Sequence, residues 1–188
     1  MKATFVLTSV LLGTMLPAHH ARNTSYNHAG NLKSRSSVSG PVGSGYIVID
    51  KSEYALSVYD NQGWYATYPV VFGTGDLGDK KMEGDNRTPE GSFKIISKRV
   101  HDKWSRFMAI DYPNDDSRKK FNIRKERGEI PASARIGGSI GIHGTWPHED
   151  FVVDKFKNWT MGCISMKRSD VEEIYNFTKI GTRVIIQK

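Results

Sequence analysis

From Tyr46 onward the chain is built mainly of short apolar runs in which apolar and polar positions alternate, and turn residues separate these runs. A period of two with β-branched and aromatic residues is typical of β-strands that bury one face. Ala55 to Tyr59 shows it most clearly and is followed by a turn at Asp60 to Gly63. The pattern predicts seven strands, at residues 46–50, 55–59, 64–72, 92–100, 106–112, 138–143 and 183–187.

Two segments have helical patterns instead. Residues 115–127 are strongly charged and end at Gly128, which predicts an exposed helix. Ser169 to Glu172 has the spacing of a capping box, and Val171, Ile174, Tyr175 and Thr178 then fall on one helical face. We therefore expect a mostly β (α+β) fold with two packed mixed sheets and two or three peripheral helices.

The N-terminal 45 residues do not read as part of this fold. Residues 1–21 combine Lys2 with an apolar run too short to span a membrane, which predicts a secretory signal peptide, with an uncleaved anchor as the alternative. Residues 22–45 are rich in Ser, Gly and Asn and predict a flexible linker. The folded domain is then residues 46–188. We expect it to be exported to the bacterial periplasm or cell envelope, as a monomer without a transmembrane span in the mature protein.

Composition narrows the class of partner. With 38% hydrophobic and 25% charged residues the chain is an ordinary globular protein. Its net charge of +7 is spread through the sequence in short runs, which argues against a nucleic-acid patch. The surplus fits either simple solvation or a diffuse attraction to an anionic polymer.

Chemistry centres on Cys163, the only cysteine. A thiol reacts as its thiolate, and a neighbouring imidazole is a common way to generate that form, so His143 is the candidate partner. A small buried core cysteine is the structural alternative. Zinc bound by His143, His148 and Cys163 is a weaker alternative, because the spacing matches no common ligand pattern. We expect neither a metal nor a cofactor, and we expect His148 and His101 to be surface residues.

Three blocks of sequence resemble the L,D-transpeptidase (YkuD) catalytic domain of bacterial cell-wall enzymes. They are Tyr68 to Gly73 (YPVVFG), Gly84 to Phe93 (GDNRTPEGSF), and Ile142 to Gly144 followed by Thr160 to Ile164 (IHG…TMGCI). The resemblance runs over residues 46–188 with the blocks in the family's order. It implies a cysteine nucleophile, Cys163, and a histidine base, His143, acting on peptidoglycan stem peptides.

The resemblance also implies roles for neighbouring residues. Cys163 would attack a stem tetrapeptide, release D-Ala and form a thioester that an amine resolves into a 3-3 cross-link. Gly162 and Thr160 belong to the turn whose backbone N–H groups would hold the oxyanion, and the Gly144 carbonyl would orient the imidazole. Trp146 and Trp159 either line the substrate groove or pack beneath the loop.

Two positions depart from the family's pattern. Met161 stands where many members have histidine, and Ser165 where many have asparagine or arginine. The acceptor is therefore open: a second stem peptide, a free D-amino acid, a protein or water. Trimming of the wall by a carboxypeptidase or amidase reaction is one alternative function, and a non-catalytic wall-binding module is another.

Overall fold

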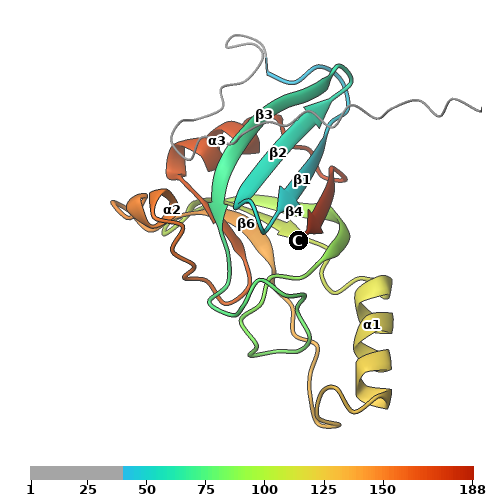
Figure 1. Ribbon diagram of the computed structural model, residues 1–188. Helices are drawn as coiled ribbons and strands as arrows, with labels where there is room; N and C mark the ends of the chain where they lie inside the picture. Colours follow the sequence, from blue (N-terminus) through green and yellow to red (C-terminus); the bar gives the residue numbers. More distant parts are fainter. Residues whose placement is uncertain (1–39) are drawn as a thin grey trace, which may run out of the picture. The chain divides into compact units, whose positions relative to one another are not determined.

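The computed structural model describes residues 40–188, so the predicted signal peptide and most of the predicted linker lie outside the described residues (Figure 1). Eight strands are present in this part of the chain: β1 (Tyr46–Asp50), β2 (Ala55–Asp60), β3 (Gly63–Val71), β4 (Gly91–His101), β5 (Ser105–Ile110), β6 (Gly141–Gly144), β7 (Ile164–Met166) and β8 (Arg183–Gln187). The seven predicted strands are all found, and the three-residue β7 is the one that the pattern did not predict.

The strands form one closed barrel in the order β1-β2-β3-β7-β6-β5-β4-β8, so the expectation of two packed sheets is wrong. Closure depends on β8, which pairs parallel with β1 and antiparallel with β4. The nine-residue β3 pairs with β2 along its first part and with β7 at Val70 and Val71. Alternation reveals which residues are buried but not which strands pair, and it therefore could not separate a barrel from a sandwich.

The barrel interior is filled from alternate positions of every strand. Ile142 of β6, Ile164 of β7 and Val70 of β3 are completely buried in the main core. The residues next to them, His143, Ser165 and Val71, face the outside of the barrel, because successive side chains along a strand point to opposite faces. A second apolar cluster covers this outer surface, with Val71, Val152 and Val153 at its centre.

Three helices accompany the barrel in the described region: α1 (Asp115–Glu126), α2 (Phe151–Asp154) and α3 (Arg168–Phe177). Helix α3 buries Val171 and Ile174, as its periodicity predicted. The predicted capping box at Ser169 to Glu172 is wrong, however, because Lys167 is the N-cap residue and makes no side-chain capping bond. Instead Asp150 accepts a hydrogen bond from the Arg168 N–H at 3.1 Å, so a distant carboxylate caps the helix.

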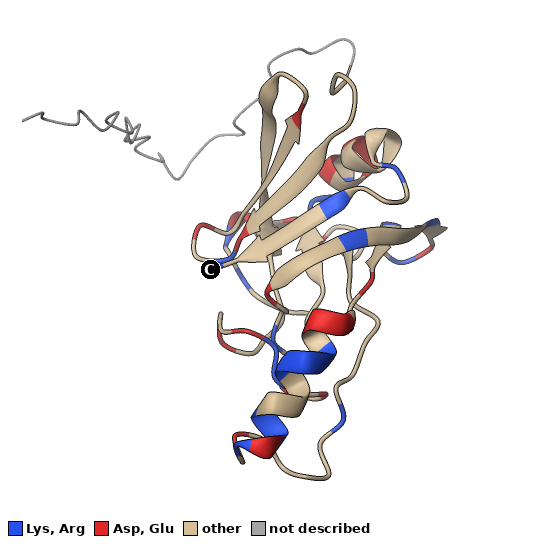
Figure 2. Cartoon of the chain, turned by 90° about the vertical axis from the view of Figure 1, so that its right-hand side faces the viewer, with Lys and Arg blue, Asp and Glu red and all other residues tan. Residues whose placement is uncertain are grey.

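Helix α1 buries none of its residues and presents basic and acidic side chains along its length (Figure 2). The Asn114 side chain caps it by accepting from Ser117 N–H at 3.0 Å. It lies beside the connection between β3 and β4, at the end of the barrel away from the β2–β3 hairpin (Figure 1). No helix within residues 40–188 is long and apolar enough to cross a membrane.

Candidate active site

The two candidate residues lie on neighbouring segments: His143 is in β6, and Cys163 comes directly before β7. The two strands run parallel, with Ile142 beside Ile164 and His143 beside Ser165. Cys163 stands two residues before Ser165, directly before the first residue of β7. An extended backbone at Cys163 would put its Cα about 8 Å from that of His143, a separation that the two side chains can bridge. The half-buried thiol lies over the entry to β6, with Sγ 3.5 Å from the Ser139 carbonyl oxygen.

The imidazole is fixed by one hydrogen bond. Nδ1 of His143 lies 2.8 Å from the Gly144 carbonyl oxygen. Because a carbonyl only accepts, Nδ1 carries the proton and Nε2 keeps a free lone pair. The Gly144 carbonyl thus makes the contact that the resemblance implied. Gly144 itself is required for another reason, since a Cβ there would lie 2.7 Å from the Trp104 carbonyl oxygen.

Both groups are neutral at rest. Burial lowers the pKa of His143 to about 4, against the weaker opposing effect of the Gly144 carbonyl, and the nearby His101 lowers it further. Burial also raises the pKa of the Cys163 thiol, although the Gly141 N–H and the charge of Lys80 act in the opposite direction. The site therefore holds a thiol beside an imidazole rather than a thiolate beside an imidazolium.

The turn that carries the thiol is held from within. Thr160 Oγ1 donates to the Cys163 carbonyl at 2.7 Å and accepts from Gly162 N–H at 3.1 Å. Gly162 has a φ of +130°, and a Cβ at this position would lie 2.8 Å from the Arg87 carbonyl oxygen. The glycine is therefore dictated by backbone conformation and by the close approach of Arg87. The Gly162 N–H, expected as an oxyanion donor, is already used by Thr160.

Aromatic side chains surround the imidazole. Trp159 presents its ring edge-on to His143, with the centroids 5.6 Å apart, and packs against the second apolar cluster. Trp146 lies one step further away, edge-on to Trp104 at 6.3 Å. Both roles predicted for these tryptophans, lining the substrate groove and packing beneath the loop, remain predictions.

Sequence reasoning missed the aromatic contact nearest to the base. Trp104, in the turn between β4 and β5, stacks on the His143 ring with the centroids 4.4 Å apart. His101, which we expected at the surface, is half-buried and also stacks on Trp104, with the centroids 4.4 Å apart. An apolar residue in a hairpin turn was the available signal, but nothing in the sequence shows that this turn folds over β6. His148 is exposed, as expected.

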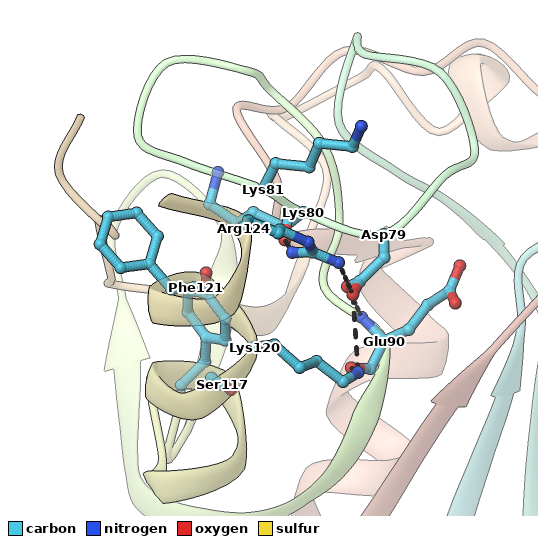
Figure 3. A pocket seen from close by; sticks show the side chains of 9 residues that line it. Asp79, Lys80, Lys81, Glu90, Ser117, Lys120, Phe121 and Arg124 are labelled. Atoms are coloured by element: carbon cyan, nitrogen blue, oxygen red, sulfur yellow. Dashed lines mark hydrogen bonds and ion pairs between the residues drawn. The ribbon is translucent and has the colours of Figure 1, made fainter. Parts of the chain in front are cut away.

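The connection between β3 and β4 forms a wall beside the thiol turn, since Gly162 lies against the Arg87 carbonyl. This connection is rich in internal ion pairs. Lys80 and Asp85 pair at 2.7 Å with both side chains nearly buried. Asp79 pairs with Arg124 of α1 at 2.7 Å, with Lys120 close by at 3.5 Å (Figure 3). The surface hollow drawn in Figure 3 is thus closed by its own salt bridges and contains neither candidate residue.

The zinc alternative finds no support in the geometry. Across residues 40–188 no three His, Cys, Asp or Glu side chains gather closely enough to hold a metal ion. His148 lies on an exposed turn after β6 with a φ of +66°.

Comparison with known proteins places this geometry in a family. Residues 44–186 match the model of the YkuD L,D-transpeptidase catalytic domain. The chain belongs to this family. A curated relative from Bacillus subtilis (strain 168), YqjB, is 28% identical over 153 residues, covering 77% of this chain and 72% of its own length. Its name places it provisionally among the L,D-transpeptidases.

Solved structures share the YkuD fold at lower identity. The helical cell shape determining protein Pgp2 of Campylobacter jejuni has a TM-score of 0.55 at 24% identity, over 77% of this chain and 48% of its own. Bd1075 of Bdellovibrio bacteriovorus has a TM-score of 0.53 at 19% identity, over 85% of this chain and 52% of its own. An L,D-transpeptidase of Mycobacterium tuberculosis H37Rv has a TM-score of 0.53 at 18% identity, over 77% of this chain and 58% of its own. The chain thus spans about half the length of these solved chains, and the likeness to them concerns the fold.

Proposed function

We propose that this YkuD domain is a peptidoglycan L,D-transpeptidase with Cys163 as nucleophile and His143 as general base. The observation that carries the proposal is the arrangement on β6 and β7. The Gly144 carbonyl accepts from Nδ1–H of His143, which leaves Nε2 unprotonated, and the half-buried Cys163 comes directly before β7, the parallel neighbour of β6. This arrangement supports a base and a nucleophile that act together. A wall-binding module would not need this pair.

In the first half-reaction Cys163 Sγ forms a bond to the carbonyl carbon between the third and fourth residues of a stem tetrapeptide. His143 Nε2 takes the thiol proton and then gives it to the departing amine, so the C–N bond breaks, D-Ala leaves and a thioester remains. Throughout, Nδ1–H stays bonded to Gly144, which keeps the ring from turning. Cys163 N–H remains the candidate oxyanion donor of the turn.

In the second half-reaction an amine attacks the thioester carbonyl. His143 Nε2 accepts the proton of the amine, the C–S bond breaks, and the proton returns to the sulfur. If the amine belongs to the third residue of another stem, the product is a 3-3 cross-link. We place this chemistry in the cell envelope, where peptidoglycan is found, and the family membership supports that substrate.

A carbapenem tests the nucleophile. The described domain, residues 40–188, should gain the mass of one drug molecule, and Cys163→Ser should gain none. Serine keeps the shape of the turn but lacks the thiol, so loss of the adduct isolates the sulfur. His143→Gln should form the adduct at least about a hundredfold more slowly, the usual contribution of a general base. Wild-type rates in His143→Gln would exclude its role as base.

Incubation with tetrapeptide-rich sacculi tests the reaction itself. Analysis of the released muropeptides should show 3-3 dimers with the enzyme and none with Cys163→Ser. Tripeptides without dimers would indicate trimming by hydrolysis instead, and a tetrapeptide with a new terminal D-amino acid would indicate exchange. An unchanged profile together with no carbapenem adduct would favour the wall-binding module.

A further inference from the structure

The turn between β4 and β5 packs against the segment that carries His143, and Trp104 makes the contacts. Its backbone carbonyl accepts from Gly144 N–H at 3.0 Å and from Arg106 N–H at 2.6 Å. Gly144 is the residue whose own carbonyl holds the imidazole. Trp104 therefore contacts the segment of His143 through its backbone as well as through its ring.

We infer that Trp104 is a positioning residue for the base: its indole holds the His143 imidazole in one plane, out of water, with Nε2 turned toward Cys163. The inference rests on the proposed role of His143. A single hydrogen bond at Nδ1 leaves the ring free to tilt about that bond. A flat surface stacked on one face removes this freedom, and Trp104 supplies it at a centroid separation of 4.4 Å and an interplanar angle of 25°.

The column of rings extends beyond Trp104. His101 also stacks on the indole, at 4.4 Å and 13°, and its Nδ1 accepts from the Lys103 and Trp104 backbone N–H groups at 3.3 Å. Phe107 of β5, the register partner of His143, lies nearly parallel to the imidazole at 6.1 Å and 6.2 Å from the indole. The indole is thus held among other rings, so it can impose its own orientation on the base.

A purely structural role for this tryptophan is the competing explanation. Trp104 is not a member of the main core cluster that fills the barrel, so its removal would not hollow the interior. Within the described residues its Nε1 has no hydrogen-bond partner, so no polar bond fixes the side chain. Its ring contacts are with His143, His101, Phe107 and Trp146. A residue so placed should influence the base more than the fold.

Several titratable or charged groups face this column and can contribute to its pH response. From β4 they are His101 and Arg99, which lies over Phe107, and from the β4–β5 turn Lys103, which lies over Trp146. The fourth group is the Cys163 thiol, directly before β7, which is the proposed partner of the base. Of these groups His101 is the one whose charge acts on the pKa of His143, and it lowers it. Replacing Trp104 leaves all four groups in place, so a change in the titration of His143 can be assigned to the loss of the indole.

The test compares Trp104→Ala with Trp104→Phe, using the rate of carbapenem acylation as a function of pH and the NMR titration of His143. Trp104→Ala should acylate about 10 to 100 times more slowly at neutral pH, the usual effect of a misplaced catalytic group. Because water then reaches the imidazole, its pKa should rise from about 4 toward the ordinary value of about 6.5. Trp104→Phe keeps a ring on the imidazole and should recover most of both properties.

Trp64→Ala is the matched control, since Trp64 is 38% exposed on the β2–β3 hairpin, and it should behave like wild type. If Trp104→Ala does not fold, Trp104→Leu keeps apolar volume without a flat ring and replaces it in the comparison. Unchanged rate and unchanged titration of His143 would overturn the inference, as would a slower rate with an unmoved titration. A wild-type protein that forms no adduct would overturn the proposed function, while the NMR titration would still decide the role of Trp104.

Discussion

The two sides of the candidate site are built from different materials. The side that carries His143 consists of rings, with Trp104, Phe107 and Trp159 around an imidazole that makes one backbone hydrogen bond. The side that supports Cys163 is the β3–β4 connection, which is held by buried charges. Lys51, directly after β1, is fully buried against this connection. Its ammonium group pairs with Glu90 at 2.7 Å and donates to the Gly78 carbonyl at 2.9 Å.

The difference shows that the two sides of the site meet different needs: one keeps the base reactive, and the other fixes the shape of the connection. The aromatic side removes water from the base, so the base stays neutral and its lone pair stays available. The charged side gives a long connection a single conformation, because each buried charge must keep its partners. The first arrangement acts on reactivity and the second on shape. Variants on the two sides should therefore fail in different ways.

The largest expected effect on the charged side comes from Asp85→Asn. Asp85 accepts from the Lys80 ammonium at 2.7 Å and from the backbone N–H groups of Lys81, Met82 and Arg87. The amide cannot replace the charge, so Lys80 is left buried without a counter-ion. Loss of one partner from a buried pair typically costs about 3–5 kcal/mol. Chemical denaturation should show a loss of this size in the free energy of unfolding.

The effect of this change should depend on pH. Burial acts to raise the pKa of Asp85, but the hydrogen bonds from Lys80 and from three backbone N–H groups together lower it. Its stabilising contribution is therefore complete above the ordinary carboxyl pKa of about 3.9. It is lost as the pH falls through the lower pKa of the folded state. Wild type and Asp85→Asn should therefore converge in acid. Asp76→Asn is the control on the same connection: the Asp76 side chain is 63% exposed and pairs with Arg87, so its loss should change the unfolding midpoint little. Equal effects of the two variants would refute the division between buried and exposed charge.

Gly162→Ala should be next in size, because it strains the contact between the connection and the thiol turn. An alanine there must hold a φ of +130° and place its Cβ 2.8 Å from the Arg87 carbonyl and 3.1 Å from Ile140 Cδ1. We expect a loss of about 1–3 kcal/mol of stability and a displaced thiol, seen as slower carbapenem acylation. Gly63→Ala is the matched control: its φ is +103°, but a Cβ there has no atom within 4 Å in the described structure. If both variants lose activity equally, backbone strain alone explains the result and the contact with Arg87 does not.

The aromatic side predicts the behaviour of the free thiol. Because burial raises the pKa of Cys163 and His143 is uncharged, the rate of alkylation by iodoacetamide should climb with pH to a midpoint above the usual value of about 8.5. His143→Gln should leave this profile nearly unchanged, since a neutral imidazole supplies no charge to a thiolate. A plateau already reached below about pH 7 and abolished in His143→Gln would show an ion pair instead.

Much of this site could be predicted from local sequence. The hypothesis that His143 pairs with Cys163 came from thiol chemistry and from the resemblance, and it stays a prediction. The contact of the imidazole with the Gly144 carbonyl followed from the resemblance, and the strands followed from alternation and turn residues. Thr160 and Gly162 were found because a short motif carries its own geometry: Thr160 bonds both ends of a three-residue turn. Such features depend on neighbours in the chain.

The parts that could not be predicted depend on distant contacts. Asp150 caps α3 from 18 residues away, and β8 closes the barrel by pairing with β1 at the other end of the domain. Trp104 lies 39 positions before the histidine that it covers, and no pattern within its hairpin indicates that contact. Burial of His143 was missed for the same reason, since an isolated strand sequence does not show what covers its outer face.

Met161→His should have the smallest effect, although it restores a residue that many family members carry. Met161 is 82% exposed, whereas its neighbours Thr160 and Gly162 are buried, so the Met161 side chain points into solvent. Exposed substitutions of this kind usually change stability by less than about 0.5 kcal/mol, and the acylation rate should stay near that of wild type. Ser165→Asn restores the other unusual position, but Ser165 is fully buried beside His143, and the added volume should cost about 1–3 kcal/mol. A large gain in acylation rate with Met161→His would show that the side chain at this position reaches the reacting groups, and the thiol side of the site would then need more than the charged connection to explain it.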